Sequence, residues 1–89
     1  NELIVLLKLF LKKMNKTLPE LEVAISQKDY TKIALLAHSV KGSSGNFRIK
    51  VLQDVASKLE ESAKNENEAY DYEESLSHMR ETLYKINIK

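Results

Sequence analysis

The chain has 89 residues, of which 43% are hydrophobic and 30% charged, and its formal net charge at pH 7 is +1. This length allows one domain with a single modest core, and the balance of 14 basic and 13 acidic residues gives no reason to expect nucleic-acid binding. The absence of cysteine excludes disulfides, thiol nucleophiles and cysteine-ligated zinc. The longest apolar run, LIVLL at residues 3–7, is too short to cross a bilayer, so no direct membrane contact is expected. We expect a single domain over residues 1–89 and, because it begins with Asn1 rather than Met, an excerpt of a longer chain.

The first segment, residues 2–28, is predicted to form one long helix. Its apolar residues recur at spacings of three and four, the period of a helix face: Leu3, Leu7, Phe10, Met14, Leu18, Leu21 and Ile25. Pro19 interrupts this pattern, and Thr17 with Glu20 can form a capping box for a new helix start. The apolar phase nevertheless continues through the proline. We therefore expect the helix to be kinked or briefly broken near residues 15–18.

Three further amphipathic segments follow the first. Asp29 is a suitable N-cap for the second segment. The apolar positions of the three segments are, in turn, Ile33, Leu36, Val40, Ser44 and Phe47; Leu52, Val55, Ala56, Leu59 and Ala63; and Tyr72, Leu76, Met79, Leu83 and Ile86. No stretch alternates with period two, and short connections favour antiparallel neighbours. The predicted fold is therefore all-α, an antiparallel up-down four-helix bundle.

Residues 37–47, AHSVKGSSGNF, are either the interior of the second helix or a loop that ends it. Gly42 and Gly45 each cost an exposed helix about 1 kcal/mol relative to alanine, which favours a loop. Phe47, however, continues the apolar phase past both glycines, which a loop has no reason to do. We therefore favour the helix.

On that helix, His38 lies nearly opposite the apolar stripe and so faces solvent. Ala34, Lys41, Gly42 and Gly45 share its sector, at i−4, i+3, i+4 and i+7. The sequence therefore predicts an exposed histidine on a surface kept clear by small residues, with one cation in reach. His78 has no such surroundings and is expected to be an ordinary surface residue.

These residues resemble the histidine-containing phosphotransfer (Hpt) domain of bacterial and fungal phosphorelays. The family signature is a histidine, two residues, Lys-Gly-Ser-Ser or a near variant, then a leucine and a later Leu-Glu. The chain has HSVKGSS at residues 38–44, then Leu52, then KLEE at residues 58–61. The stretch before the histidine, with its proline and its Asp-aromatic turn, is also similar, so the resemblance covers nearly the whole chain.

One position departs from the family pattern. The family usually has glycine where this chain has Arg48, at the turn from the second helix to the third. If that position needs a positive φ, either Arg48 is strained or Asn46 adopts the left-handed conformation instead.

The resemblance implies a function for His38. Its Nε2 atom would accept a phosphoryl group from the phosphoaspartate of a receiver domain and pass it to another receiver aspartate. Lys41 would screen the phosphoryl oxygens as a point charge, and the small residues Ala34, Gly42 and Gly45 would form the docking surface. The receiver domain is expected to bring the acidic pocket and Mg²⁺, so this chain is expected to need no cofactor or metal of its own.

Glu60 and Lys64 are further candidates. In the related phosphotransfer domain of the chemotaxis kinase, the matching glutamate accepts a hydrogen bond from Nδ1 of the phosphoacceptor, which makes Glu60 the candidate here. The alternative is a solvated glutamate that pairs with Lys64 at i+4. Lys64 is in turn a candidate second cation for the phosphoryl group.

Two other functions stay open beside that of a phosphorelay intermediate. One is the phosphotransfer domain of a chemotaxis-type kinase, phosphorylated in trans by an ATP-binding domain, against which Arg48 weighs. The other is a helical adaptor that binds receivers without carrying phosphate, which has no need of His38 and Lys41 together. No glycine-rich nucleotide loop is present, so we expect a phosphoryl carrier within a hybrid sensor histidine kinase. It is expected to be monomeric as an isolated domain. It is also expected to be cytoplasmic, which includes the case that it forms the cytoplasmic part of a membrane-anchored sensor kinase.

Overall fold

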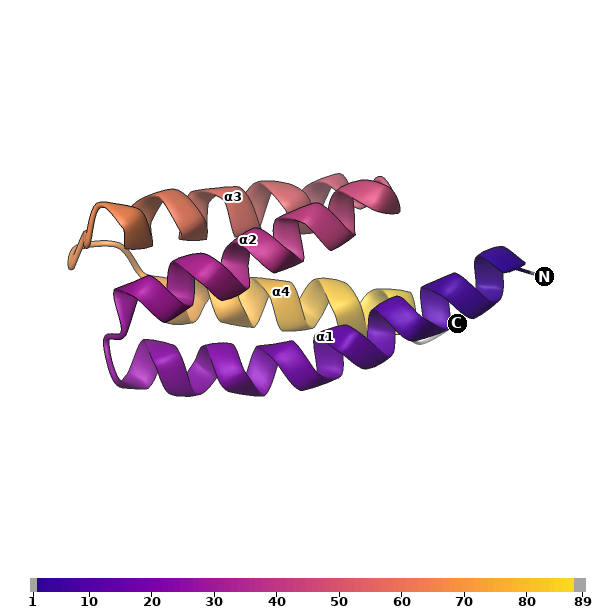
Figure 1. Ribbon diagram of the computed structural model, residues 1–89, viewed down its shortest axis with the longest axis horizontal. Coiled ribbons are helices and arrows are strands. Elements are labelled where there is room, and N and C mark those ends of the chain that lie inside the picture. The colour runs from indigo at the N-terminus through magenta and orange to yellow at the C-terminus, as the bar shows by residue number, and fades with distance from the viewer. Residues whose placement is uncertain (1, 88–89) are drawn as a thin grey trace.

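The computed structural model describes residues 2–87 and folds them into a four-helix bundle without strands (Figure 1). The helices are α1 (Glu2–Ser26), α2 (Tyr30–Asn46), α3 (Lys50–Lys64) and α4 (Tyr72–Asn87). Each helix packs against two others, so that α1 contacts α2 and α4 while α3 contacts the same two helices. The contact between α2 and α3 is the most extensive of the four, and these two helices carry the residues that the sequence singles out.

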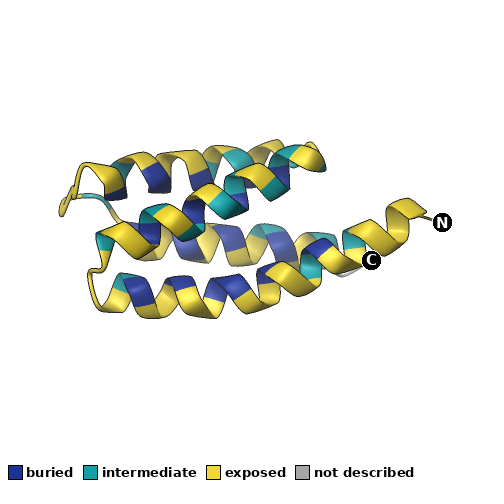
Figure 2. Cartoon of the chain, viewed as in Figure 1, coloured by how far each residue is buried: buried dark blue, intermediate teal, exposed yellow. Residues whose placement is uncertain are grey.

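The core lies where the four apolar faces meet. Met14, Leu21, Leu59 and Met79 have no exposed surface, and Figure 2 shows the buried residues along the inward sides of all four helices. Burying each such side chain contributes about 1.5–3 kcal/mol. The predicted periodicity of the four segments therefore corresponds to the faces that the bundle buries.

The first helix differs from its prediction in two ways. It ends at Ser26 rather than at residue 28, because Lys28 adopts a positive φ of 54° that leaves the helix. It also runs without a break through Pro19, and Thr17 is a buried residue in its interior rather than the cap of a new start. Pro19 is exposed, and because proline has no N–H, the helix lacks the hydrogen bond to the carbonyl of Asn15. The expected break is absent, and the kink remains a prediction.

The first turns of α1 extend past the ends of the other helices (Figure 1). Leu3, predicted to face the core, is 64% exposed, since it lies in these extending turns. Further large apolar residues in these turns are also more than half exposed: Ile4, Val5, Leu6 and Leu9. The buried stripe of α1 therefore begins at Phe10.

Three of the four helices end in the same cap. The second residue past α1, α2 and α3 has a φ of 54°, 56° and 49° respectively: Lys28, Arg48 and Glu66. After α2, the Arg48 N–H donates to the carbonyl of Gly45 at 3.1 Å and the Ile49 N–H donates to that of Ser44 at 3.0 Å. These are the two hydrogen bonds of a Schellman motif. Arg48, and not Asn46, therefore takes the left-handed conformation at the position where the family has glycine.

The two glycines of the chain are not used at any of these caps. Glycine adopts a positive φ at no steric cost, yet the left-handed positions hold a lysine, an arginine and a glutamate. Gly42 and Gly45 lie inside α2, where each costs about 1 kcal/mol relative to alanine. The predicted helix through residues 37–46 is confirmed, and its glycines need a reason other than stability.

The strain at Arg48 is open to test. Arg48→Gly should raise the free energy of unfolding by about 1 kcal/mol, because glycine removes the cost of a left-handed conformation. In a domain of this size that corresponds to about 4–8 °C in Tm, measured by thermal circular dichroism. Arg48→Ala keeps the Cβ and serves as the control. An equal gain from alanine would show that the loss of the arginine side chain, and not φ, is responsible.

Candidate functional site

His38 projects from the exposed side of α2. Asp29 caps this helix by accepting a hydrogen bond from the Lys32 N–H at 3.2 Å, which fixes where the helix begins. Ala37 and Val40 on either side of the histidine are fully buried, so the same helix that packs its inner face presents His38 outward. The His38 side chain is 67% exposed, as the helical wheel predicts.

Glu60 approaches His38 from α3. It follows the fully buried Leu59 and is itself only 5% exposed, so Glu60 is not solvated as the alternative supposed. Close packing of α2 on α3 brings its Oε2 atom to 3.0 Å from Nδ1 of His38. The placement at the flank of the apolar face is what allows a carboxylate to be covered and still reach the neighbouring helix.

This contact determines which ring nitrogen carries the proton. An ionised carboxylate has lone pairs but no hydrogen to donate, so Nδ1 of His38 must be the donor. In the neutral ring the other nitrogen, Nε2, is then unprotonated and nucleophilic. The arrangement leaves that nucleophile on the side of the ring away from Glu60.

Two lysines also contact the Glu60 carboxylate. Lys41 Nζ lies 2.8 Å from Oε1, and Lys64 Nζ lies 3.2 Å from Oε2. The hydrogen bond from Lys41 is the largest influence on the carboxyl and, with those from Lys64 and His38, it outweighs the effect of burial. Together they lower the pKa of Glu60 from 4.5 to about 2. The cluster is therefore a covered carboxylate with three donors, and the i+4 pair with Lys64 exists beside the contact with His38.

The small residues beside His38 differ in their surroundings. Gly42 is exposed, and a Cβ built on it would meet no atom within 4 Å. At Gly45 a Cβ would lie 3.2 Å from Nε2 of Gln53 on α3, and Ala34 is partly covered by the core. Of the three small residues predicted to form an open surface beside His38, only Gly42 is fully uncovered. Gly45 is partly covered by Gln53 of α3, and Ala34 packs against the core.

Sequence reasoning missed one polar contact between α1 and α2. Lys13 on α1 donates a hydrogen bond to Oγ of Ser43 on α2 at 2.9 Å. No spacing in the sequence indicates this contact, because it joins residues of two different helices. Ser44 is fully buried and donates to the carbonyl of Val40 at 2.6 Å, so it is a packing residue.

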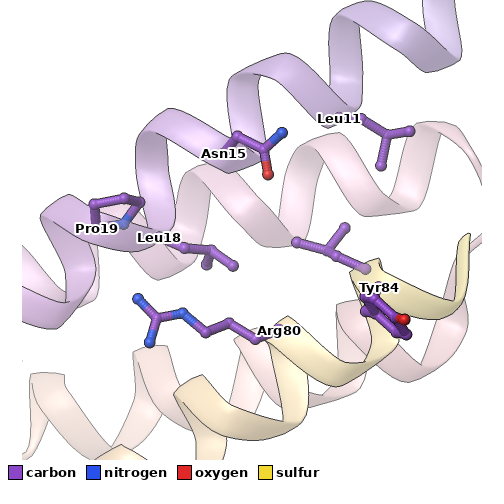
Figure 3. Close-up of a pocket in the computed structure, with 7 residues that line it drawn as sticks. Leu11, Asn15, Leu18, Pro19, Arg80 and Tyr84 are labelled. Atoms are coloured by element: carbon purple, nitrogen blue, oxygen red, sulfur yellow. The ribbon is translucent and has the colours of Figure 1, made fainter. Parts of the chain in front are cut away.

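A second region of the described surface, between α1 and α4, has few ionisable side chains. Figure 3 shows a groove between α1 and α4, the helices that do not bear the histidine cluster. It is lined by Leu11, Asn15, Leu18, Pro19, Arg80, Leu83 and Tyr84. Its one ionisable cation, Arg80, contacts Glu22 at 2.6 Å. Within residues 2–87 no three potential metal-ligating side chains converge.

The family comparison agrees with this geometry. A model of the Hpt domain family matches residues 5–87. The chain belongs to the Hpt domain family. Hpt domains have a phosphotransfer role in two-component signalling and interact with receiver domains, so phosphohistidine chemistry is the context of this chain. Comparisons with curated proteins and with solved structures give no match. Among the described helices of this Hpt domain, none is both long and apolar enough to span a membrane.

The lowered pKa of Glu60 makes a prediction about acid stability. Because the folded-state pKa of about 2 lies below the ordinary 4.5, the unfolded chain binds the proton more readily. The stabilisation is therefore complete above pH 4.5 and is lost as the pH falls toward 2. Urea titrations at pH 7 and pH 3 should show that the Hpt domain loses more stability over this interval than its Glu60→Gln variant.

The matched control for this measurement is Glu61→Gln, which changes the exposed residue next to Glu60. It should lose as much stability between the two pH values as the unsubstituted domain. Parallel losses for the domain and for Glu60→Gln would contradict the account of the cluster.

Proposed function

We propose that this Hpt domain is a phosphorelay intermediate in which His38 accepts a phosphoryl group from a receiver phosphoaspartate and passes it to another receiver aspartate. The observation that carries the proposal is the hydrogen bond between Nδ1 of His38 and Oε2 of Glu60, at 3.0 Å. It leaves Nε2 unprotonated on a side chain that is 67% exposed, where a partner can reach it.

The transfer itself needs little from the chain besides position and charge. The lone pair of Nε2 forms the N–P bond while the P–O bond to the receiver breaks, and the aspartate leaves as a carboxylate. Nδ1 keeps its proton throughout, so the phosphorylated ring carries a positive charge that faces Glu60. In the second transfer a receiver aspartate oxygen forms the new P–O bond while the N–P bond breaks. The His38 ring then leaves phosphorus as neutral imidazole, which is a far better leaving group than its anion.

Lys41 is the proposed phosphoryl-stabilising cation. It is one helical turn from His38, and its side chain is 34% exposed. An ammonium group is a compact point charge on a flexible stem, so it can move from Glu60 toward phosphoryl oxygens on the outer side of the ring. A phosphate-free adaptor would have no use for this arrangement.

Gly42 is proposed as the centre of the receiver docking surface, with Ala34 and Gly45 at its margins. The open space above Gly42 supports this assignment, as does its helix-interior position, where glycine reduces stability. Mg²⁺ is assigned to the receiver domain, and this chain is proposed to need no cofactor.

The chemotaxis-type alternative has one observation in its favour. The contact between Glu60 and Nδ1 of His38 is the one expected of the phosphotransfer domain of a chemotaxis kinase, which an ATP-binding domain phosphorylates in trans. The two functions differ in the phosphoryl donor, which is a receiver phosphoaspartate in one and an ATP-binding kinase domain in the other. A direct comparison of these two donors therefore separates them.

The wider setting is part of the same proposal. We propose that the chain is a single cytoplasmic Hpt domain of a hybrid sensor kinase. In that setting the chain carries the phosphoryl group and does not itself act as a kinase. The up-down arrangement of the helices is supported by the fact that consecutive helices are neighbours and α4 returns to α1.

His38→Gln should abolish phosphorylation of the domain, because it removes the only proposed acceptor. The measurement is the uptake of labelled phosphate from a panel of phosphorylated receiver domains and, separately, from an ATP-binding kinase domain. His78→Gln is the matched control, since His78 is also an exposed histidine on a helix, and it should load normally. Acid-labile phosphate on the His38→Gln variant would refute the proposal, and loading only from the kinase domain would favour the alternative.

A further inference from the structure

The Glu60 carboxylate divides its partners unevenly between its two oxygens. Oε1 contacts Lys41 at 2.8 Å, whereas Oε2 contacts both Nδ1 of His38 at 3.0 Å and Lys64 at 3.2 Å. Lys64 therefore meets the carboxylate on the oxygen that also holds the imidazole proton. This places Lys64 on the Nδ1 side of the ring, away from the nitrogen that would carry phosphate.

Lys41 faces two demands that conflict. In the structure its ammonium group neutralises Glu60, but a phosphoryl group on Nε2 of His38 needs the same cation on the outer side of the ring. Glu60 is 5% exposed, and an uncompensated buried charge is unfavourable. Before the N–P bond forms the His38 ring is neutral, so Lys41 turns to the incoming phosphoryl group at least cost if another cation stays with the carboxylate.

We propose that Lys64 is a positioning residue, which holds the Glu60 carboxylate and thereby frees Lys41 to move to the phosphoryl group. Lys64 acts through Glu60 and does not touch the phosphoryl group itself. This inference rests on the proposed function of His38. It replaces the expectation that Lys64 is a second phosphoryl cation.

The charges around the site fit this division of roles. A small surface pocket lies over the Glu60 carboxylate. Lys41 lines it from α2, and Lys64 and Glu61 line it from α3. With a neutral His38, the carboxylate and its two lysines sum to one positive charge. When Lys41 moves toward an incoming phosphoryl group while the ring is still neutral, Lys64 balances Glu60, and the charge of Lys41 is available for the phosphoryl oxygens.

Lys64→Met tests this proposal, because methionine keeps a long side chain without the charge. The readout is the initial rate at which the domain is loaded by phosphoramidate, a small phosphoryl donor that needs no receiver, followed by phosphorus NMR. Loading should slow about fivefold, within the range of couplings measured in one salt-bridge network. Lys64→Arg keeps the cation and should restore most of the rate.

The matched control is Lys85→Met. Lys85 forms the same kind of i,i+4 pair, with Glu81 at 3.6 Å, on the exposed side of α4, and its loss should leave loading unchanged. Circular dichroism on each variant confirms that the fold is retained.

A double-mutant cycle identifies the route of the effect. In a Glu60→Gln background there is no carboxylate to hold, so adding Lys64→Met should change the loading rate no further. An equal slowing in both backgrounds would show that Lys64 acts on the phosphoryl group directly, and this would overturn the inference. No slowing in the unsubstituted background would overturn it as well.

An equilibrium measurement separates this inference from the proposed function. Titration of the Glu60 carboxyl by carbon-13 NMR should give a higher pKa in Lys64→Met than in the unsubstituted domain, because one hydrogen-bonding cation is lost. An unchanged titration would refute the role of Lys64 whatever the kinetics show. If instead the unsubstituted domain takes no phosphate on His38 from any donor, the proposed function fails while the titration still reports on the pair.

Discussion

The covered carboxylate of Glu60 is the interaction on which the rest of the site depends. It joins α3 to three donors, two of them on α2, and it holds the proton on Nδ1 of His38. An exposed histidine without a partner has neither a fixed tautomer nor a fixed orientation. The buried Glu60 carboxylate fixes both the tautomer and the orientation of His38, because a hydrogen bond to a largely covered group is stronger than one in water. The most extensive helix contact, between α2 and α3, is thus also the contact that organises the chemistry.

The placement of the glycines likewise favours the surface around His38 over the stability of the helix caps. Three Schellman caps place non-glycine residues at positive φ, while the only glycines lie inside α2 near His38. Moving glycine to the caps and alanine into the helix would stabilise the fold on both counts. The observed pattern costs stability and leaves the face around Gly42 bare. Sites of function are where such departures from local preference are expected.

Periodicity was sufficient to predict the four helices and the outward direction of His38, because both depend on local spacing along one helix. It failed where a neighbouring helix decides the outcome. The exposure of Leu3 follows from its place in the turns of α1 that extend past the described ends of the other helices, and the cover over Gly45 reflects Gln53 on α3. The contact of Lys13 with Ser43 joins residues 30 positions apart. Glu60 was a candidate only through resemblance, since its burial depends on how closely α2 and α3 approach.

The central claim is that Glu60 fixes the proton on Nδ1 and leaves Nε2 of His38 as the nucleophile. Nitrogen NMR of the domain labelled with nitrogen-15 histidine, at pH 8 and before and after loading with phosphoramidate, tests it most directly. The account predicts a protonated Nδ1 and an unprotonated Nε2 in the free domain, and a phosphorus–nitrogen coupling at Nε2 after loading. A free ring protonated at Nε2, or phosphate attached at Nδ1, would contradict it.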